Sequence, residues 1–139
     1  MQANYDELLN KAKEVSKNSY SPYSKFKVGA AVLYESGNVY CGVNVENVSY
    51  GITLCAERCA ISSAIAAGET TKIAAIAVYS PNQKNCLPCG ACRQWLAEFA
   101  PDNTHDLKII LEGCKGESVA WGLDEIFPDS FKFTNCDID

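Results

Sequence analysis

The first pattern along the chain is an apolar stripe with helical spacing near its start. Asn4 precedes two acidic residues, and a side-chain cap followed by acidic residues is typical of a helix N-terminus. The apolar positions that follow recur every three or four residues, at Leu8, Leu9, Ala12 and Val15. This spacing predicts an amphipathic helix that runs to about residue 18. Polar residues and Pro22 then end the periodicity.

Later segments have the composition of β-strands. Residues 26–33 and 39–44 flank a short polar turn, which predicts an antiparallel hairpin. Residues 73–79 form a continuous apolar run, typical of a central strand that is covered on both faces. The segment between residues 108–111 and 118–121 is too short to hold a crossover helix, so these last two strands are expected to run antiparallel.

Helical segments alternate with these strands. Residues 55–67 are rich in alanine and are followed by Gly68, which is typical of a helix C-terminus. Residues 90–99 predict a second internal helix, and a short closing helix is expected around residues 123–127. The alternation predicts an α/β fold, a three-layer α/β/α sandwich around a five-stranded mixed sheet. Because no internal repeat or linker interrupts it, we expect a single catalytic domain over residues 1–139.

Composition and charge narrow the class of protein. Of the 139 residues 47% are hydrophobic, and 12 Lys and Arg against 17 Asp and Glu give a formal net charge of −5. No apolar run approaches the roughly 18 residues of a membrane span. The acidic balance disfavours a nucleic-acid surface, which needs clustered Lys and Arg. Residues 1–20 lack the basic start and apolar stretch of an export signal, so we expect a soluble, cytoplasmic protein with a small or neutral partner.

Eight cysteines are many for this length, but they fall short of the roughly 8–10% that marks a small disulfide scaffold. Without an export signal, metal binding or reduced thiols fit better than disulfides. We expect the isolated Cys41, Cys114 and Cys136 to be buried as small apolar side chains. The role of Cys86, close to other cysteines in the sequence, stays open.

Three of the cysteines indicate a metal site. Cys55 stands at the start of one internal helix, and Cys89 and Cys92 stand at the start of the other. A helix start carries a partial positive charge that lowers the pKa of a thiol and favours the thiolate a metal needs. Three thiolate ligands leave the fourth tetrahedral position of zinc open, the arrangement of a catalytic site. His105 lies in a polar loop and is not expected to be a ligand.

Glu57 is the candidate acid and base beside this site. It lies two residues after Cys55, so in a regular helix the two side chains are about 200° apart around the axis. Both can serve one site only if that site lies beyond the N-terminal end of the helix. A carboxylate there can take a proton from a water molecule, whereas the simpler interpretation is a solvated first-turn carboxylate.

These residues carry a family resemblance. The segment Cys55-Ala-Glu-Arg, followed about thirty residues later by Pro88-Cys-Gly-Ala-Cys-Arg-Gln, resembles the signature of zinc-dependent deaminases. The segments Phe26-Lys-Val-Gly-Ala-Ala and Gly42-Val-Asn-Val-Glu-Asn, with the all-cysteine metal set, are similar to the small homotetrameric cytidine deaminases of pyrimidine salvage. The resemblance implies a five-stranded sheet, one zinc ion per chain, and a homotetramer whose active sites are shared between subunits.

The resemblance also implies the reaction, which is hydrolytic deamination of cytidine and deoxycytidine to uridine and deoxyuridine with release of ammonia. Glu57 would be the catalytic residue that carries protons from a zinc-activated water to the ring nitrogen and the departing amino group. Arg58, and with it Arg93, would donate hydrogen bonds to the ligating sulfurs and compensate their charge.

The remaining predicted site residues bind the nucleoside. Asn44 and Glu46 are two apart, so in an extended backbone they face the same side, and in the family the matching pair binds the ribose hydroxyls. The resemblance implies that Phe26 packs against the base and that the backbone of Ala56 contacts its polar edge. Two further residues, Tyr50 and Phe131, resemble residues that reach the active site of a neighbouring subunit.

Other classes of protein share parts of this pattern. A ferredoxin-type cluster would need a fourth cysteine where Leu96 stands, and a structural zinc ribbon would need a second Cys-x-x-Cys pair. A blasticidin-type or free-base deaminase would share the zinc residues, and Asn44 with Glu46 argues against it by pointing to a nucleoside. Enzymes that edit tRNA or polynucleotides usually have a histidine in the first zinc motif and a basic surface, which this chain lacks.

Overall fold

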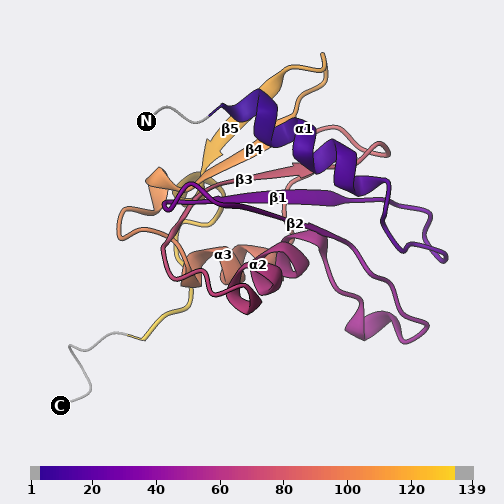
Figure 1. The fold of residues 1–139 in the computed structure, drawn as a ribbon, viewed down its shortest axis with the longest axis horizontal. Helices are drawn as coiled ribbons and strands as arrows, with labels where there is room; N and C mark the ends of the chain where they lie inside the picture. Colours follow the sequence, from indigo (N-terminus) through magenta and orange to yellow (C-terminus); the bar gives the residue numbers. More distant parts are fainter. Residues whose placement is uncertain (1–3, 134–139) are drawn as a thin grey trace.

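The computed structural model describes residues 4–133, and it places helices and strands in the predicted alternation (Figure 1). In chain order the elements are α1 (Tyr5–Ser16), β1 (Gly29–Tyr34), β2 (Val39–Val43), α2 (Ala56–Ala66), β3 (Ile73–Tyr79), α3 (Gly90–Glu98), β4 (Lys108–Glu112), β5 (Ser118–Gly122) and α4 (Leu123–Ile126). Two short 3-10 helices, Tyr50–Ile52 and Thr104–Asp106, lie in the connections. Asn4 caps α1 as predicted, because its side chain accepts a hydrogen bond from the Glu7 amide.

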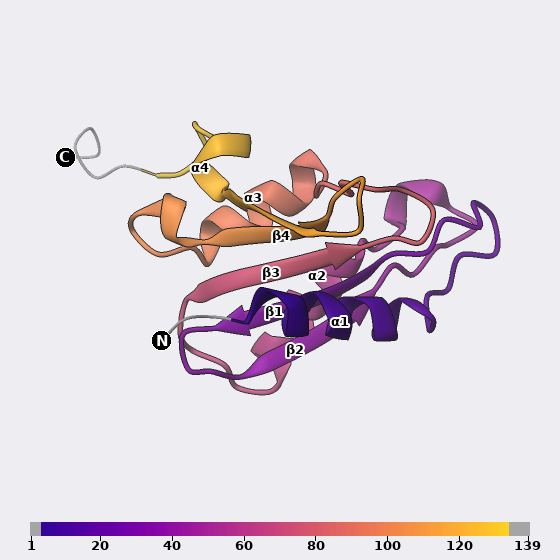
Figure 2. The same ribbon diagram turned by 90° about the horizontal axis from the view of Figure 1, so that it is seen from above.

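The strands form one mixed sheet with the order β2-β1-β3-β4-β5. The β1–β2 hairpin and the β4–β5 pair are antiparallel as predicted, β1 and β3 are also antiparallel, and β3 and β4 are parallel. Figures 1 and 2 show α1 on one face of the sheet and α2 with α3 on the other. This arrangement confirms the predicted three-layer sandwich with a five-stranded mixed sheet.

Each face of the sheet has its own apolar core. The larger core lies under α2 and α3 and includes Ile76 and Ile109, whereas the smaller one lies under α1 and includes Ala77 and Ile110. Neighbouring residues of β3 and β4 therefore enter opposite cores, which is why β3 and the three central residues of β4 are apolar. On the larger side Gly42 lets α2 approach β2 closely, because a Cβ there would lie 2.3 Å from the Ala60 nitrogen.

The first strand is shorter than the sequence predicts. It begins at Gly29, because the amides of residues 26–28 donate to side chains instead of to a neighbouring strand. The Phe26 amide donates to Ser24 Oγ (3.0 Å) and the Lys27 amide donates to Asn82 Oδ1 (3.1 Å). Residues 26–28 therefore form a connection that leads from a turn into the sheet.

The prediction for the isolated cysteines is only partly met. Cys41 is half-buried beside the smaller core, but Cys114 is exposed, so its predicted burial is wrong. Cys114 lies in the turn between β4 and β5, where no second layer covers it. Its sulfur accepts a hydrogen bond from the side-chain amide of Asn85. Cys136 lies outside the described residues.

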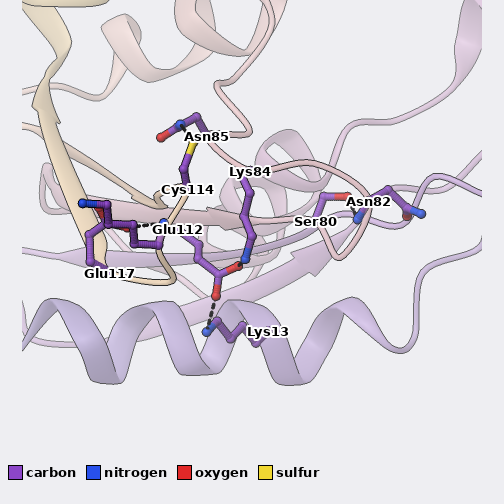
Figure 3. Close-up of polar contacts among 9 residues, drawn as sticks. Lys13, Ser80, Asn82, Lys84, Asn85, Glu112, Cys114 and Glu117 are labelled. Atoms are coloured by element: carbon purple, nitrogen blue, oxygen red, sulfur yellow. Dashed lines mark hydrogen bonds and ion pairs between the residues drawn. The ribbon is translucent and has the colours of Figure 1, made fainter.

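The connection from β3 to α3 is tied to the rest of the fold at Glu112 (Figure 3). Its carboxylate pairs with Lys13 of α1 (2.7 Å) and with Lys84 of the connection. The Glu112 carbonyl also accepts a hydrogen bond from the Asn85 amide (2.9 Å). The loop that leads to α3, which carries Cys89 and Cys92 at its start, is thus fixed to β4 and α1.

Across residues 4–133 there is no helix with the length and apolar character that a membrane crossing requires.

Glu69, just after α2, holds the turn between β1 and β2. One carboxylate oxygen accepts hydrogen bonds from Ser36, Asn38 and Tyr40, and the other accepts from the hydroxyl (2.6 Å) and amide (3.2 Å) of Thr71. These bonds, led by the one from the Thr71 hydroxyl, lower the pKa of Glu69 to about 2. The carboxyl is therefore ionised in the folded protein at all but very acidic pH.

This network predicts a pH-dependent contribution to stability. Because the folded-state pKa lies below the ordinary value of 4.5, the contribution is complete above pH 4.5 and is lost as pH falls toward 2. We expect Glu69→Gln to lower the melting temperature at pH 7, and the difference from wild type to shrink between pH 5 and pH 3. Thermal unfolding followed by circular dichroism gives the melting temperature at each pH. Glu35→Gln, in the turn between β1 and β2, is the control. A difference that stays constant from pH 7 to pH 3 would contradict the assignment.

Candidate metal centre and active site

Three cysteine sulfurs meet where α2 and α3 begin. Cys55 is the N-cap of α2, Cys89 is the N-cap of α3, and Cys92 lies in the first turn of α3. All three sulfurs lie within 4.8 Å of one another, and those of Cys55 and Cys89 are 3.9 Å apart. The fold thus brings together the three cysteines that the sequence predicts as metal ligands.

The spacing of this three-sulfur group fits zinc. Two sulfurs bound to tetrahedral zinc at about 2.3 Å are about 3.8 Å apart, close to the separation of Cys55 and Cys89. Sulfur donors favour zinc over hard cations such as Mg²⁺. His105 lies elsewhere, with its Nδ1 atom 2.8 Å from an oxygen of Asp124.

The coupled ionisation of Cys55 and Cys92 favours a bound cation. Hydrogen bonds from Cys92 and from the Arg58 guanidinium lower the pKa of Cys55, whereas the closeness of Cys55 raises the pKa of Cys92. Without a metal, Cys55 and Cys92 therefore do not ionise together, because the two thiolates would face each other at close range and repel. A dication removes that repulsion and lets all three sulfurs ionise.

Glu57 is buried beside the group, with 4% of its surface exposed. Burial is the main cause that raises its pKa to about 7, and the neighbouring charge of Cys55 acts in the same direction. A carboxyl group with such a pKa can both take and give a proton near neutrality. The interpretation of Glu57 as a solvated first-turn carboxylate does not fit this burial.

The two arginines have different partners. Arg58 Nη2 lies 3.2 Å from Cys55 Sγ and also donates to the Thr53 carbonyl, so this side chain contacts a ligating sulfur. Arg93 instead donates to the carbonyls of Pro88 (2.8 Å) and Ile126 (2.7 Å). It therefore fixes the start of α3 to α4, and no sulfur is among these partners.

Cys86, whose role the sequence left open, is not one of the three sulfurs. Its side chain packs against the larger core, and burial raises the pKa of its thiol to about 11. The Glu57 carboxylate adds to that rise. Cys86 is thus a protonated, half-buried thiol near neutral pH.

Asn44 and Glu46 lie in a short extended stretch that leads from β2 toward the cysteine site. Between them, Val45 exchanges two backbone hydrogen bonds of 2.9 Å with Leu54, the residue before Cys55. On its other side Val45 pairs in parallel with Tyr20. The stretch is therefore placed between the segment around Tyr20 and the start of α2.

Both side chains are hydrogen-bonded to the segment before β1, which sequence reasoning did not anticipate. Asn44 Oδ1 accepts from the hydroxyl of Ser19, and Glu46 Oε2 accepts from the hydroxyl of Ser24. The partners are more than twenty residues apart in the sequence, and serines in a polar loop carry no pattern that would reveal them.

The other predicted site residues occupy different surroundings. Ala56 is buried next to Cys55, and Phe26 is half-buried at the end of the turn that Ser24 closes. Tyr50 and Phe131 are exposed by 72% and 73% in the single chain. Tyr50 packs edge-on against Tyr23, and the Phe131 backbone exchanges two hydrogen bonds with Gln94 of α3.

Known proteins match this chain over most of its length. A family model of the cytidine and deoxycytidylate deaminase zinc-binding region matches residues 2–105. The cytidine deaminase of Halalkalibacterium halodurans is 40% identical over 124 residues, which cover 89% of this chain and 91% of that protein. The crystal structure of the cytidine deaminase from Burkholderia pseudomallei has a TM-score of 0.82 and 40% identity, and the match covers 93% of this chain and 100% of that one. The corresponding structure from Mycobacterium tuberculosis also has a TM-score of 0.82, with 34% identity and coverage of 95% and 100%.

Three cysteine sulfurs beside a buried carboxyl group are the side chains that a catalytic zinc site requires. The fold and the comparisons make the class more specific. The chain belongs to the cytidine and deoxycytidylate deaminase family, whose members share this zinc-binding region.

Proposed function

We propose that this protein catalyses the hydrolytic deamination of cytidine and deoxycytidine to uridine and deoxyuridine, with release of ammonia, as a cytoplasmic enzyme of pyrimidine salvage. The observation that carries the proposal is the buried Glu57 carboxylate beside the three-sulfur group of Cys55, Cys89 and Cys92. Similarity to cytidine deaminases over about nine-tenths of the chain supports the choice of substrate.

Cys55, Cys89 and Cys92 would hold one zinc ion per chain, and zinc when bound supplies a Lewis acid that lowers the pKa of a water molecule toward neutrality. Glu57 takes one proton from the attacking water and gives it to the ring nitrogen next to carbon 4. A second proton, from the new hydroxyl on carbon 4, passes through Glu57 to the amino group. The carbon–nitrogen bond then breaks, so that ammonia leaves and the pyrimidine keeps a carbonyl.

Arg58 balances charge in this mechanism. Three thiolates carry more negative charge than one zinc ion neutralises, which makes nearby water harder to deprotonate. The guanidinium at 3.2 Å from Cys55 Sγ withdraws charge from that sulfur and keeps it in place. Arg93 acts less directly, by holding the loop before Cys89 through the Pro88 carbonyl.

The nucleoside would lie between the cysteine site and the stretch that carries Asn44 and Glu46. In this proposal Phe26 packs against the base, the Ala56 backbone and Glu57 contact its polar edge, and Asn44 with Glu46 binds the sugar. The pairing of Val45 with Leu54 fixes the distance between the sugar side and the metal side. A substrate without a sugar would lose the contacts with Asn44 and Glu46.

The choice of a nucleoside is tested by substrate comparison. The purified protein is incubated with cytidine, deoxycytidine and cytosine, and ammonia and product are quantified. We expect both nucleosides to be deaminated, and cytosine at least about 100-fold more slowly, because the sugar contacts are missing. Faster turnover of cytosine, or ammonia release only from another aminated heterocycle, would favour a free-base or blasticidin-type enzyme instead.

Assembly into a homotetramer is part of the proposal. Val48, Tyr50 and Ile52 alternate along the connection that leads to Cys55, with 77%, 72% and 68% of their surfaces exposed, and Phe131 is similarly exposed. Apolar side chains gathered in this way are typical of an interface between protein chains. Tyr50 and Phe131 would then reach the active site of a neighbouring subunit.

Light scattering coupled to size-exclusion chromatography measures the assembly. We expect about 60 kDa for wild type, four times the 15.1 kDa of one chain. Ile52→Asp is expected to give smaller species with lower activity, because it places a charge in the interface. A fully active wild type of 15 kDa would contradict both the assembly and the shared sites.

A further inference from the structure

The side chain of Asn44 has little hydrogen-bonding capacity left. Its Oδ1 atom accepts from the Val28 amide (3.0 Å) and from the Ser19 hydroxyl, and its Nδ2 atom donates to the Phe26 carbonyl (2.8 Å). The orientation of the amide is forced, because the Val28 amide can only donate and the Phe26 carbonyl can only accept. Both lone pairs of Oδ1 are used. The remaining free group is one N–H, so Asn44 can only donate to a ligand.

Glu46 has the opposite capacity. Its Oε1 atom accepts from the amides of Tyr23 (3.0 Å) and Ser24 (3.1 Å), and its Oε2 atom accepts from the Ser24 hydroxyl. The Ser24 hydroxyl is the main cause that lowers the pKa of Glu46, so the carboxylate is ionised at neutral pH. An ionised carboxylate has no hydrogen to give. The remaining free group is a lone pair on Oε2, so Glu46 can only accept from a ligand.

The two serines hold these orientations as part of one folded segment. The Ser24 hydroxyl donates to Glu46 and also accepts from the Phe26 amide (3.0 Å), which ties the sugar side of the site to the base side. The backbone of Tyr20 pairs with the same stretch, because its amide donates to the Asn44 carbonyl (3.1 Å) and its carbonyl accepts from the Glu46 amide (2.9 Å). The segment from Ser19 to Phe26 therefore wraps around Asn44 and Glu46 and leaves neither side chain free to rotate.

We propose that Ser19 and Ser24 are positioning residues that fix Asn44 as a donor and Glu46 as an acceptor, so that the site selects a sugar group able to accept and donate at once. A free hydroxyl is such a group. Hydrogen in its place leaves a charged carboxylate without its partner, and an ether oxygen can accept from Asn44 but cannot donate to Glu46. This inference rests on the proposed function, because it takes Asn44 and Glu46 as the sugar-binding pair.

The test measures kcat and KM for cytidine, 2′-deoxycytidine and 3′-deoxycytidine with wild type and with Ser24→Ala. In wild type, the deoxynucleoside with the larger loss in kcat/KM identifies the hydroxyl that the pair contacts. In Ser24→Ala we expect kcat/KM for cytidine to fall roughly tenfold, mostly through KM, because a hydrogen bond to a charged group that orients the pair is lost. The deoxynucleoside that lacks the contacted hydroxyl should lose little, so discrimination between the two should fall by about the same factor.

Further variants separate positioning from general loosening of the loop. Ser24→Thr keeps the hydroxyl and is expected to restore discrimination, whereas Ser19→Ala should reduce it by releasing Asn44. Ser118→Ala, at an exposed position in β5, is the matched control and should leave kcat and KM for all three nucleosides unchanged. Thermal unfolding shows whether each variant is folded.

Two results would overturn the inference. One is an equal loss for all three nucleosides, which indicates a structural effect only, and the other is unchanged discrimination in both alanine variants. Turnover of cytidine by wild type together with either result leaves the proposed function standing. Absence of turnover of every nucleoside by wild type would overturn the proposed function, and this inference with it.

Discussion

Replacing Glu57 with glutamine is expected to lower kcat for cytidine by at least about 10³-fold while zinc stays bound at one ion per chain. Glutamine has nearly the same shape and packs in the same buried position, but it cannot take the two protons that the reaction moves. The Cys55, Cys89 and Cys92 sulfurs are unchanged, so the metal has no reason to leave. Initial rates give the activity and elemental analysis gives the zinc content.

Glu98→Gln is the matched control for this variant, because Glu98 is an exposed residue of α3. It should retain both activity and zinc. Activity of Glu57→Gln within tenfold of wild type would remove Glu57 from the chemistry. Loss of zinc together with activity would instead indicate that Glu57 supports the metal site.

Replacing Cys92 with serine is the second change with a large expected effect. Cys92 is buried in the three-sulfur group, and a neutral hydroxyl is a poor substitute for a thiolate ligand of zinc. We expect zinc content to fall below about a tenth of an ion per chain and activity to fall by at least about 10³-fold. Even the loss of a residue that only hydrogen-bonds to a metal ligand typically lowers metal affinity 10–100-fold.

Cys86→Ser provides the control for this substitution. Cys86 is a half-buried cysteine in the adjacent connection, but its sulfur is outside the three-sulfur group. The variant should keep one zinc ion and most of the activity. If Cys86→Ser loses zinc and Cys92→Ser keeps it, the assignment of ligands is wrong.

Much of the fold follows from local patterns in the sequence. The helix from Tyr5 and the strand from Ile73 are long, regular signals, and the structure has both close to the predicted bounds. The start of β1 differs, because the amides of residues 26–28 donate to the side chains of Ser24, Asn82 and Asn44. Asn82 lies 55 residues from its partner Lys27, and the burial pattern of a strand does not report such contacts.

The candidate site could be predicted where it depends on helix starts. Cys55 and Cys89 are the N-caps of their helices, and Glu57 lies in the first turn of α2. The partial positive charge at a helix N-terminus is common to most helices, so its effect on these side chains can be predicted from the sequence. The partners of Arg93 could not be predicted in this way, because the Ile126 carbonyl meets it only through the position of α4 in the folded chain. The roles of Ser19 and Ser24 likewise depend on how a loop closes over distant residues.

Zinc-dependent deamination can be followed by the ultraviolet absorbance of cytidine during incubation with the purified protein, beside a sample from which zinc has been chelated. We predict that the cytidine band decays with the untreated protein, persists after chelation, and decays again when one equivalent of zinc is restored. Decay that is unaffected by chelation, in a protein shown to contain no zinc, would mean that Glu57 and the three-sulfur group do not form a zinc-dependent deaminase site.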